Sequence, residues 1–465
     1  MTPDALAEAR VPPPDTLGGW IQLAYIANQT LTDPSAFQQA LSEWREQYPG
    51  HSGLREIVPE LRELSLERAA PPEHVALLLP FQGRFAQAAE AVRDGFLAAW
   101  YADTDNPARP EITVRDASAA NVRSVYERAV EAGADFVVGP LDKESVSTLA
   151  GSARITVPTL ALNVVSAPAE ETPAESETLA DEETAPVGPA SATDNPAREA
   201  AHGTELPDAL YQFALSPEGE ASRVAERAWF AGYERAGVIV PEGVWGERVA
   251  DAFTAAWERL GGAVVGSETY PNDTPEMSAS VERLLNVNES RGRWLALRRL
   301  LRRDIEYEPR VRQDIDFVFM AAFPRQARQL RPQLKFHNAE DIPVYATSHI
   351  FSGVEDASAD RDIDGVIFGD MPWVLLAEAT DELRQKIKSA WSDSFEDYVR
   401  LYAFGVDAYR VIPHLGKLRA RRYAAFNGKT GRLSLDATNR IERQLMWAEF
   451  RDGIPRTGGS DMALR

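Results

Sequence analysis

The 465-residue chain has no cysteine, which excludes disulfides, thiolate metal sites, a cysteine nucleophile and a lipid-bearing cysteine within this sequence. It also lacks any run of 18 apolar residues, and its first ten residues, MTPDALAEAR, lack the apolar core of a signal peptide. We therefore expect a chain that is soluble as written, or a fragment from which an export signal has been removed.

Positive charge is scarce, because 49 Lys and Arg residues stand against 71 Asp and Glu residues and leave a net charge of −22. Such a field disfavours nucleic acids and anionic membranes as partners. A solvated acidic surface, as in a salt-adapted organism, is the simplest interpretation of this excess. The exception is an arginine-rich stretch over 291–312.

Motifs that carry chemistry are also missing. The six histidines are scattered, none forms an H-E-x-x-H pattern, and there is no phosphate-binding G-x-x-x-x-G-K or G-x-G-x-x-G sequence. The neighbours Ser348 and His349 have no meaning as a triad, because triads are assembled in space. We expect no catalytic residue, no metal ion and no cofactor.

What the chain does have is a buried strand followed by an amphipathic helix, over residues 74–101. An unbroken apolar run at 75–79 predicts a strand covered on both faces, as in a parallel sheet between helices. Pro80 and Gly83 end the strand, and apolar residues then recur at helical spacing from Phe85 to Tyr101. Together they form half of a βαβ unit, which repeats to about residue 370.

The repeated pattern predicts α/β architecture with two doubly wound lobes. The later strands are expected at 111–115, 136–138, 156–162, 211–215, 237–240, 263–270, 317–320, 344–346 and 363–368. Helices at 380–390, 394–414 and 436–448, and a hairpin at 426–435, are expected to complete the chain.

Two segments stand outside this pattern. Residues 14–66 predict three short helices that resemble one tetratricopeptide-type hairpin, which cannot bury its own apolar face and so needs a neighbour to pack against. Residues 166–200 contain nine acidic residues and a single basic one, Arg198, among Pro, Ala and Thr. That composition predicts a disordered insertion.

The ends of the strands supply the candidate binding residues, because open α/β sheets bind ligands at the carboxyl ends of their strands. Asn163 and Ser216 could either contact a ligand or cap a loop, and the sequence leaves both alternatives open. The cleft candidates are Phe81, Gly83, Gly139, Pro140, Asn163, Ser216, Trp245, Ser348 and Trp373.

The arginine stretch supplies the candidate docking residues, Arg298, Arg299 and Arg302. It could form a docking surface for an acidic partner or an anionic glycan. The alternative is an exposed helix whose arginines pair with Asp304 and nearby glutamates, and the residues favour this slightly.

Several strings resemble the type I periplasmic-binding-protein fold: LPFQG (79–83), FVVGP (136–140) and FNGKTG (426–431). Longer ones resemble the LpoA family of penicillin-binding-protein activators: AVRDGFLAAWY (91–101), RVRQDIDFVFMAAFPRQARQLRPQLKFH (310–337), IPVYATSHIFSG (342–353) and FGVDAYRVIPHL (404–415). The resemblance covers nearly all of 70–450. The chain departs from the family pattern in lacking most of the helical N-terminal domain and the lipid-bearing cysteine, and in having the segment 166–200.

The resemblance implies a helical unit at 1–70, a first lobe at 74–216 plus about 373–418, and a second lobe at 217–372 plus about 419–465. It implies a non-catalytic regulator on the periplasmic side of the outer membrane that stimulates a class A penicillin-binding protein. Contact with the membrane would be only through a lipid anchor absent from this sequence, and we expect a monomer. The alternative that the fold allows is a periplasmic solute-binding or sensing protein with its ligand between the lobes.

Overall fold

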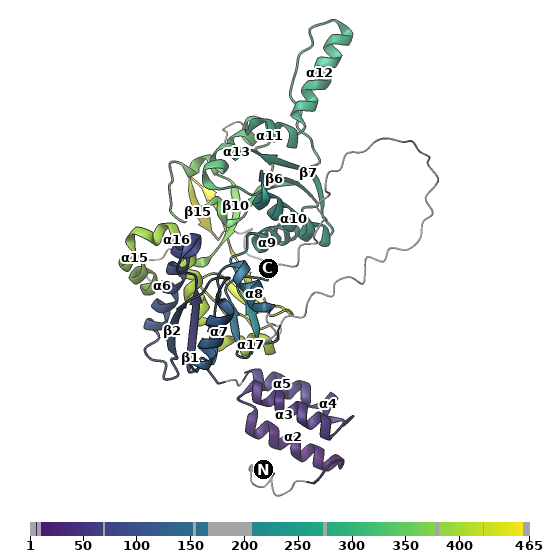
Figure 1. The fold of residues 1–465 in the computed structure, drawn as a ribbon. Coiled ribbons are helices and arrows are strands. Elements are labelled where there is room, and N and C mark those ends of the chain that lie inside the picture. Colours follow the sequence, from purple (N-terminus) through teal and green to yellow (C-terminus); the bar gives the residue numbers. More distant parts are fainter. Residues whose placement is uncertain are drawn as a thin grey trace, which may run out of the picture.

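The computed structural model describes residues 6, 11–67, 70–151, 155–165, 207–272, 277–376, 381–421 and 423–458. A helical unit is followed by two α/β lobes with separate sheets, which confirms the expected fold class (Figure 1). Within the described ranges, no helix combines the length and apolar character needed to cross a lipid bilayer. The segment 166–200, expected to be disordered, lies outside the described residues.

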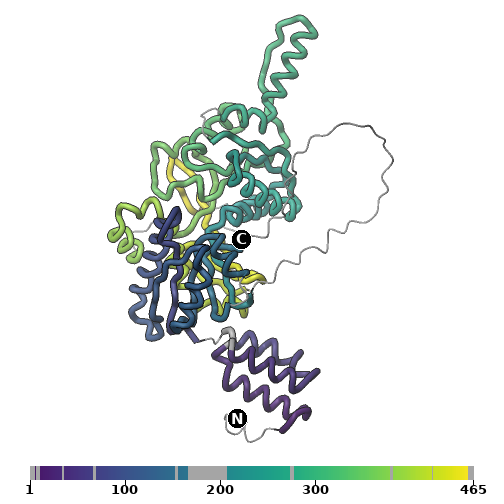
Figure 2. The backbone as a smooth tube through the Cα atoms, in the orientation of Figure 1, coloured from purple at the N-terminus to yellow at the C-terminus, as the bar shows by residue number. Residues whose placement is uncertain are grey.

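The helical unit has a core of its own. Its helices are α2 (Thr16–Thr30), α3 (Pro34–Gln47), α4 (Gly53–Glu56) and α5 (Val58–Glu67). Asp15 caps α2 by accepting a hydrogen bond from the Gly18 N–H at 2.8 Å. Phe37, Leu41 and Trp44 are buried in this core. The unit also packs α5 against α17 (Leu415–Ala420), so it has the neighbour that the sequence requires (Figure 2).

The first lobe contains a parallel sheet in the order β2-β1-β3-β4-β5. Its strands are β1 (His74–Leu79), β2 (Glu111–Asp116), β3 (Phe136–Val138), β4 (Thr159–Ala161) and β5 (Leu210–Gln212). Strand β1 is buried on both faces, as its apolar run predicts. Leu77 packs in the core that includes α6 (Ala86–Ala102) and α16 (Ser392–Arg410), and Leu78 packs with α7 (Val122–Glu131) and α8 (Lys143–Ala150).

The second lobe contains a seven-stranded sheet in the order β15-β14-β10-β9-β8-β6-β7. Its strands are β6 (Arg235–Pro241), β7 (Ala263–Tyr270), β8 (Phe317–Met320), β9 (Val344–Ala346), β10 (Val366–Asp370), β14 (Met446–Arg451) and β15 (Ile454–Thr457). Helices α9 (Pro217–Phe230) and α10 (Val244–Arg259) pack with Phe319 on one face. Helices α11 (Ser278–Leu284) and α13 (Pro324–Phe336) pack with Met320 on the other.

The prediction of a helix at 436–448 is wrong, because those residues contribute to two strands. Strand β13 (Ile441–Gln444) pairs with β12 (Arg432–Leu435), which also pairs with β11 (Phe426–Asn427), and β14 pairs with β10 and β15. The turn between β14 and β15 uses Asp452 and Gly453, which have positive φ angles of 55° and 72°. Asp-Gly is a strong hairpin signal that the periodicity argument overlooked.

Among the described residues, the chain passes from the first lobe to the second after β5 and returns in α14 (Pro372–Leu375), which leads to α15 (Glu382–Ala390) and α16. It crosses again between β13 and β14. Strands β11–β13 form a separate sheet that contacts β5 through a bridge between Gln212 and Arg440. The lobe boundaries that we propose therefore assign 426–444 to the first lobe.

The turn of the β11–β12 hairpin is held by a buried carboxylate of α16. Asp407 accepts hydrogen bonds from the N–H groups of Lys429 and Thr430, at 2.7 and 2.6 Å, and from the Thr430 hydroxyl at 2.6 Å. A Cβ at Gly428 would lie 2.4 Å from Oδ2 of Asp407, which explains the glycine. The strings FGVDAYR and FNGKTG are thus two halves of one contact.

We expect Asp407→Ala to lower the free energy of unfolding by about 2–4 kcal/mol, because three donors lose their acceptor in a buried turn. Urea unfolding followed by circular dichroism measures this loss. The matched control is Asp397→Ala, an exposed aspartate of the same helix, which should change stability by less than about 0.5 kcal/mol. Equal stabilities for the two variants would contradict the role given to Asp407.

Candidate functional site

The candidates from the first lobe lie together at one edge of its sheet, since β1, β3 and β4 are parallel neighbours. The Phe81 N–H donates to Asp116 at 2.9 Å, and exposed Gly83 begins the turn η1 (Gly83–Phe85) with a φ of +75°. Gly139 has a φ of +105° and precedes buried Pro140 through a cis peptide bond. A Cβ at Gly139 would lie 2.1 Å from the carbonyl oxygen of Leu78, so packing accounts for this glycine.

The two polar candidates that could contact a ligand are used by the chain itself. The side-chain amide of Asn163 donates to the Leu141 carbonyl at 2.9 Å, and its oxygen accepts from the Val164 N–H at 3.0 Å. Ser216 caps α9 by accepting from the Gly219 N–H at 3.1 Å. The structure therefore favours the loop-capping alternative for both.

The remaining candidates, Trp245, Ser348 and Trp373, are packed against protein as well. The Trp245 ring stacks on Phe323 with centroids 5.0 Å apart and meets the edge of His349 at 5.2 Å. Ser348 is buried in the turn η2 (Ser348–Ile350). Buried Trp373 lies under the Lys429 ammonium at 5.4 Å. Trp245 and Ser348 thus lie around His349, whereas Trp373 contacts Lys429 in the turn of the β11–β12 hairpin.

A buried carboxylate that sequence reasoning missed organises this region. Glu220 of α9 accepts hydrogen bonds from the hydroxyl and N–H of Ser348, at 2.7 and 3.1 Å. It also forms an ion pair with Arg443 of β13 at 3.2 Å. Burial alone would raise the pKa of the Glu220 carboxyl, but His349, Arg443 and Ser348 hold that pKa below its ordinary value.

A second buried ion pair lies beside it, between Arg400 of α16 and Asp370 at the end of β10. Arg400 also donates to the carbonyls of Ser348 and Phe351, at 3.2 and 2.9 Å. Burial raises the pKa of the Asp370 carboxyl even though Arg400 opposes this. His349 faces both pairs, and burial lowers the pKa of its imidazole although Glu220 favours protonation.

Both ion pairs join the first lobe to the second, since α16 and β13 lie on the side of the first sheet and α9 and β10 on the side of the second. We call Glu220, Ser348, Asp370, Arg400 and Arg443 the interlobe cluster. Its carboxylates are engaged by its own arginines and serine, which leaves this cluster suited to fixing the lobes rather than to binding a solute. The sequence gives no signal for it, because Glu220 and Arg443 are 223 residues apart.

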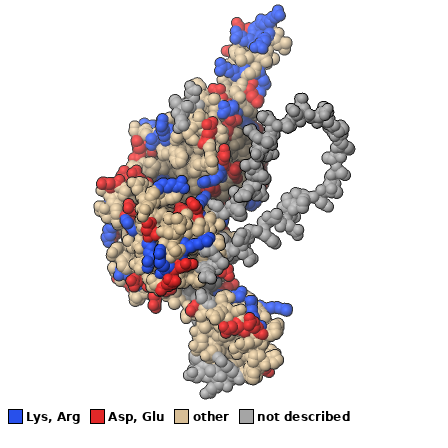
Figure 3. Space-filling model, viewed as in Figure 1, with Lys and Arg blue, Asp and Glu red and all other residues tan. Residues whose placement is uncertain are grey.

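The docking candidates lie on a separate feature that projects from the second lobe, one helix, α12 (Val287–Leu301), with an extended segment that returns from it, which we call the α12 hairpin (Figure 1). Helix α12 carries Arg298 and Arg299, and Arg302 follows it with a left-handed φ of 53°. Arg298 pairs with Asp304 at 2.8 Å, as the alternative interpretation expects. Within the described part of the chain, Arg299 and Arg302 have no ion pair. Basic side chains gather over the tip of this hairpin (Figure 3).

The exposed leucines of α12 were not singled out by the sequence. Leu295 and Leu297 are 45% and 51% exposed, and Leu300 and Leu301 are 77% and 56% exposed. They stand among the arginines, so the hairpin offers both charge and apolar area. The segment that follows the helix is held against its middle by Trp294, whose indole N–H donates to the Ile305 carbonyl at 2.9 Å and whose ring centroid lies 5.0 Å from that of Tyr307.

Among the described residues, no group of three or more His, Asp or Glu side chains could hold a metal ion.

The chain is similar to a known family and to several known proteins. The family model described as "LppC putative lipoprotein" matches residues 4–186 and 194–453. The break between these ranges, 187–193, falls inside the segment 166–200. The penicillin-binding protein activator LpoA of Vibrio antiquarius is 28% identical over 446 residues, which are 94% of this chain and 67% of that protein. The chain thus spans about two thirds of that relative.

Solved structures show the same fold. Full-length LpoA from Haemophilus influenzae superimposes with a TM-score of 0.61 at 22% identity, covering 98% of this chain and 72% of that one. Its C-domain alone, described as a regulator of PBP1A, gives a TM-score of 0.58 at 23% identity, covering 83% of this chain and 100% of that one. A putative branched-chain amino acid ABC transporter from Chromobacterium violaceum gives 0.52 at 26% identity, covering 81% and 99%.

The matches extend from the helical unit to β14 and β15, and they join the LpoA proteins to the periplasmic-binding-protein architecture. By this match over most of its length, the chain belongs to the LppC putative lipoprotein family, with the penicillin-binding protein activator LpoA among its relatives.

Proposed function

We propose that this protein is a non-catalytic regulator that binds and stimulates a class A penicillin-binding protein from the periplasmic side of the outer membrane. The membership of its family and the names of its relatives support this function. A lipid anchor outside this sequence would hold it at the membrane.

The observation that carries the proposal is the projecting α12 hairpin. On a chain with a net charge of −22, a helix tip with Arg299 and Arg302 free of ion pairs among the described residues is locally basic. Next to them, Leu300 is 77% exposed. Arginine is among the residue types enriched at the hot spots of protein interfaces. We therefore propose that α12 meets an acidic, partly apolar surface of the synthase.

The alternative function is solute binding or sensing in the interlobe cleft, and the likeness to the transporter protein of Chromobacterium violaceum is what favours it. Ligand-driven closure needs a ligand that binds the closed state better than the open one. In the cleft, Asn163, Ser216 and Ser348 already spend their hydrogen bonds on the protein. The geometry therefore supports the regulator over the solute binder.

The test of the docking surface is charge reversal by Arg298→Glu, Arg299→Glu and Arg302→Glu together. We expect the affinity for the organism's class A penicillin-binding protein to fall by about tenfold or more, because attractive charges become repulsive. Stimulated crosslinking of peptidoglycan should fall in parallel. Pull-down, surface plasmon resonance and a crosslinking assay provide the measurements.

The matched control reverses Arg259, Arg361 and Arg456, three exposed arginines away from α12, and so makes the same change in net charge. It should leave binding within about twofold, since only the general field changes. Circular dichroism should show an intact fold in both triple variants. Normal binding by the α12 variant would exclude this hairpin, and absence of binding by the unmutated chain would count against the proposed function.

A separate prediction concerns the contribution of the interlobe cluster to stability. Arg400→Met leaves Asp370 buried without its ionic partner, and we expect the free energy of unfolding to fall by about 3–5 kcal/mol. The control is Arg451→Met, which removes an exposed ion pair with Glu449 of β14 and should cost less than about 1 kcal/mol. Guanidinium unfolding of both variants measures the two free energies of unfolding. Equal decreases would show that the buried ion pair contributes no more to stability than the exposed one.

The same cluster predicts little closure of the lobes in solution. X-ray scattering of the chain with and without a library of amino acids and other small solutes should give one radius of gyration, because the lobes are already joined. A solute that both raises the melting temperature and reduces this radius would restore the solute-binding function.

A further inference from the structure

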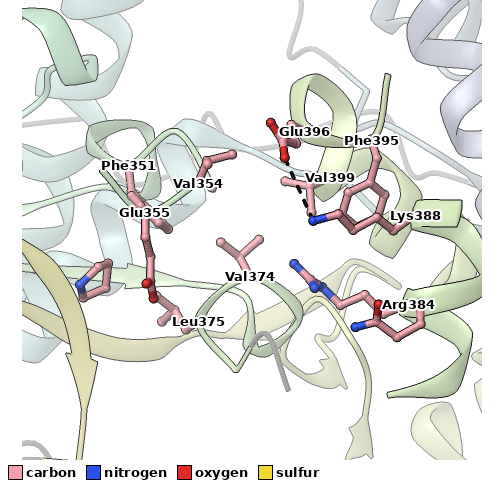
Figure 4. A pocket seen from close by; sticks show the side chains of 13 residues that line it. Phe351, Val354, Glu355, Val374, Leu375, Arg384, Lys388, Phe395, Glu396 and Val399 are labelled. Carbon is pink, nitrogen blue, oxygen red and sulfur yellow. Dashed lines mark ion pairs between the residues drawn. The ribbon is translucent and has the colours of Figure 1, made fainter. Parts of the chain in front are cut away.

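A cavity of about 340 Å³ lies apart from all nine cleft candidates, between α15, α16 and the segment 351–355 (Figure 4). Its lining mixes apolar side chains, among them Phe351, Val374 and Phe395, with the polar ones Glu355, Arg384, Gln385, Lys388 and Glu396. This volume falls at the lower end of the range of small-molecule pockets, about 300–1,000 Å³. The cavity therefore has the size of a site for one small molecule with an apolar and a polar part.

Among the polar side chains that line the cavity, Arg384 is the buried one. This side chain points into the cavity in Figure 4, and the residue is only 7% exposed. Its Nε has no hydrogen-bond partner, and within the described ranges no carboxylate forms an ion pair with Arg384. The carboxylate whose charge acts on Arg384 is that of Asp381, the N-cap of α15, and it is engaged by Lys429. A buried guanidinium without a counter-ion is costly, and a ligand carboxylate would remove that cost.

The orientation of Arg384 is set by Phe395, whose ring centroid lies 5.2 Å from the guanidinium carbon. Stacking on an aromatic ring leaves the edge of the guanidinium free, and that edge matches the two oxygens of a carboxylate. The other cation at the cavity, Lys388, already pairs with Glu396 at 4.0 Å. Glu355 stands on the opposite wall and disfavours a ligand with several negative charges. The cavity therefore suits one carboxylate joined to an apolar body.

The floor of the cavity is firmly built. The φ of Gly353 is +93°, and a Cβ there would lie 2.9 Å from Cγ1 of Val399. Arg400 holds the start of this segment through the Phe351 carbonyl at 2.9 Å. The cavity is thus shaped by α15 and α16 on one side and by the second lobe on the other.

We propose that this cavity is a binding site for a monocarboxylate with an apolar body, anchored by Arg384 against Phe395. The carboxylate can come from a free organic acid or from the C-terminus of a polypeptide that ends in an apolar residue. This site is independent of α12 and of the proposed function, so the failure of either leaves the other standing.

The test is binding of 3-phenylpropionate to the full chain, measured by isothermal titration calorimetry. We expect saturable one-to-one binding, and at least tenfold weaker binding of the neutral 3-phenylpropanamide. Arg384→Met should weaken binding of the acid at least tenfold and bring it to the level of the amide. The matched control Lys386→Met removes a charge from an exposed position on the same helix and should change the affinity by less than about twofold.

A second variant guards against a folding defect at the buried arginine. Val354→Trp introduces a large ring at a position that lines the cavity and is 40% exposed, so it should block binding without removing Arg384. Melting temperatures close to that of the unmutated chain show that both variants fold. Binding of the acid that survives in both variants, equal binding of acid and amide, or binding of neither 3-phenylpropionate nor the peptide acetyl-Ala-Ala-Phe would overturn the proposal.

The source of the carboxylate is decided with acetyl-Ala-Ala-Phe carrying a free or an amidated C-terminus. Binding of the free peptide that is tighter than that of 3-phenylpropionate and is lost on amidation indicates a polypeptide C-terminus. Binding of 3-phenylpropionate alone indicates a free acid.

Discussion

Two buried ion pairs, Arg443 with Glu220 and Arg400 with Asp370, cross the boundary between the lobes and set what the rest of the molecule can do. Taking four charges out of water is expensive, and the attraction between partners repays this only while both members of each pair are in place. The arrangement therefore specifies one relative placement of the lobes more than it adds stability. The three chain passages run beside these pairs, so any movement at the boundary would disturb them.

Because these ion pairs fix the lobes, the cleft between them is not expected to close on a solute. In a fold that commonly closes on a solute, the strand ends carry groups that wait for a ligand, but here Asn163 caps a loop, Ser216 caps α9, and Ser348 serves Glu220. The residues left free for outside contacts lie elsewhere, on the α12 hairpin and around Arg384. A scaffold that is shared with solute binders can thus act as a rigid frame that presents surfaces.

The charge distribution supports the same division. The acidic surface limits non-specific contact, and it makes the one basic hairpin a directed feature that an acidic partner would find through long-range attraction. Arg384 differs from the surface arginines, because its guanidinium is buried. Its burial, and not the overall charge of the surface, is what favours the binding of an anion there. A surface charge acts on the rate and orientation of encounter, whereas a buried one acts on what can remain bound.

The sequence by itself determined the strands and the class of fold. Apolar runs at Val75–Leu79 and Phe317–Met320 can be satisfied only in a sheet covered on both faces, and the caps at Asp33, Asp142 and Ser216 are local chemistry. The sequence failed at 436–448, where the same apolar spacing fits a helix or strands, and only pairing with β10 and β12 decides. It could not reveal the Glu220–Arg443 pair or the isolation of Arg384, because these depend on which distant side chains meet. Local periodicity fixes an element, but the partner of a buried charge is chosen by the tertiary packing alone.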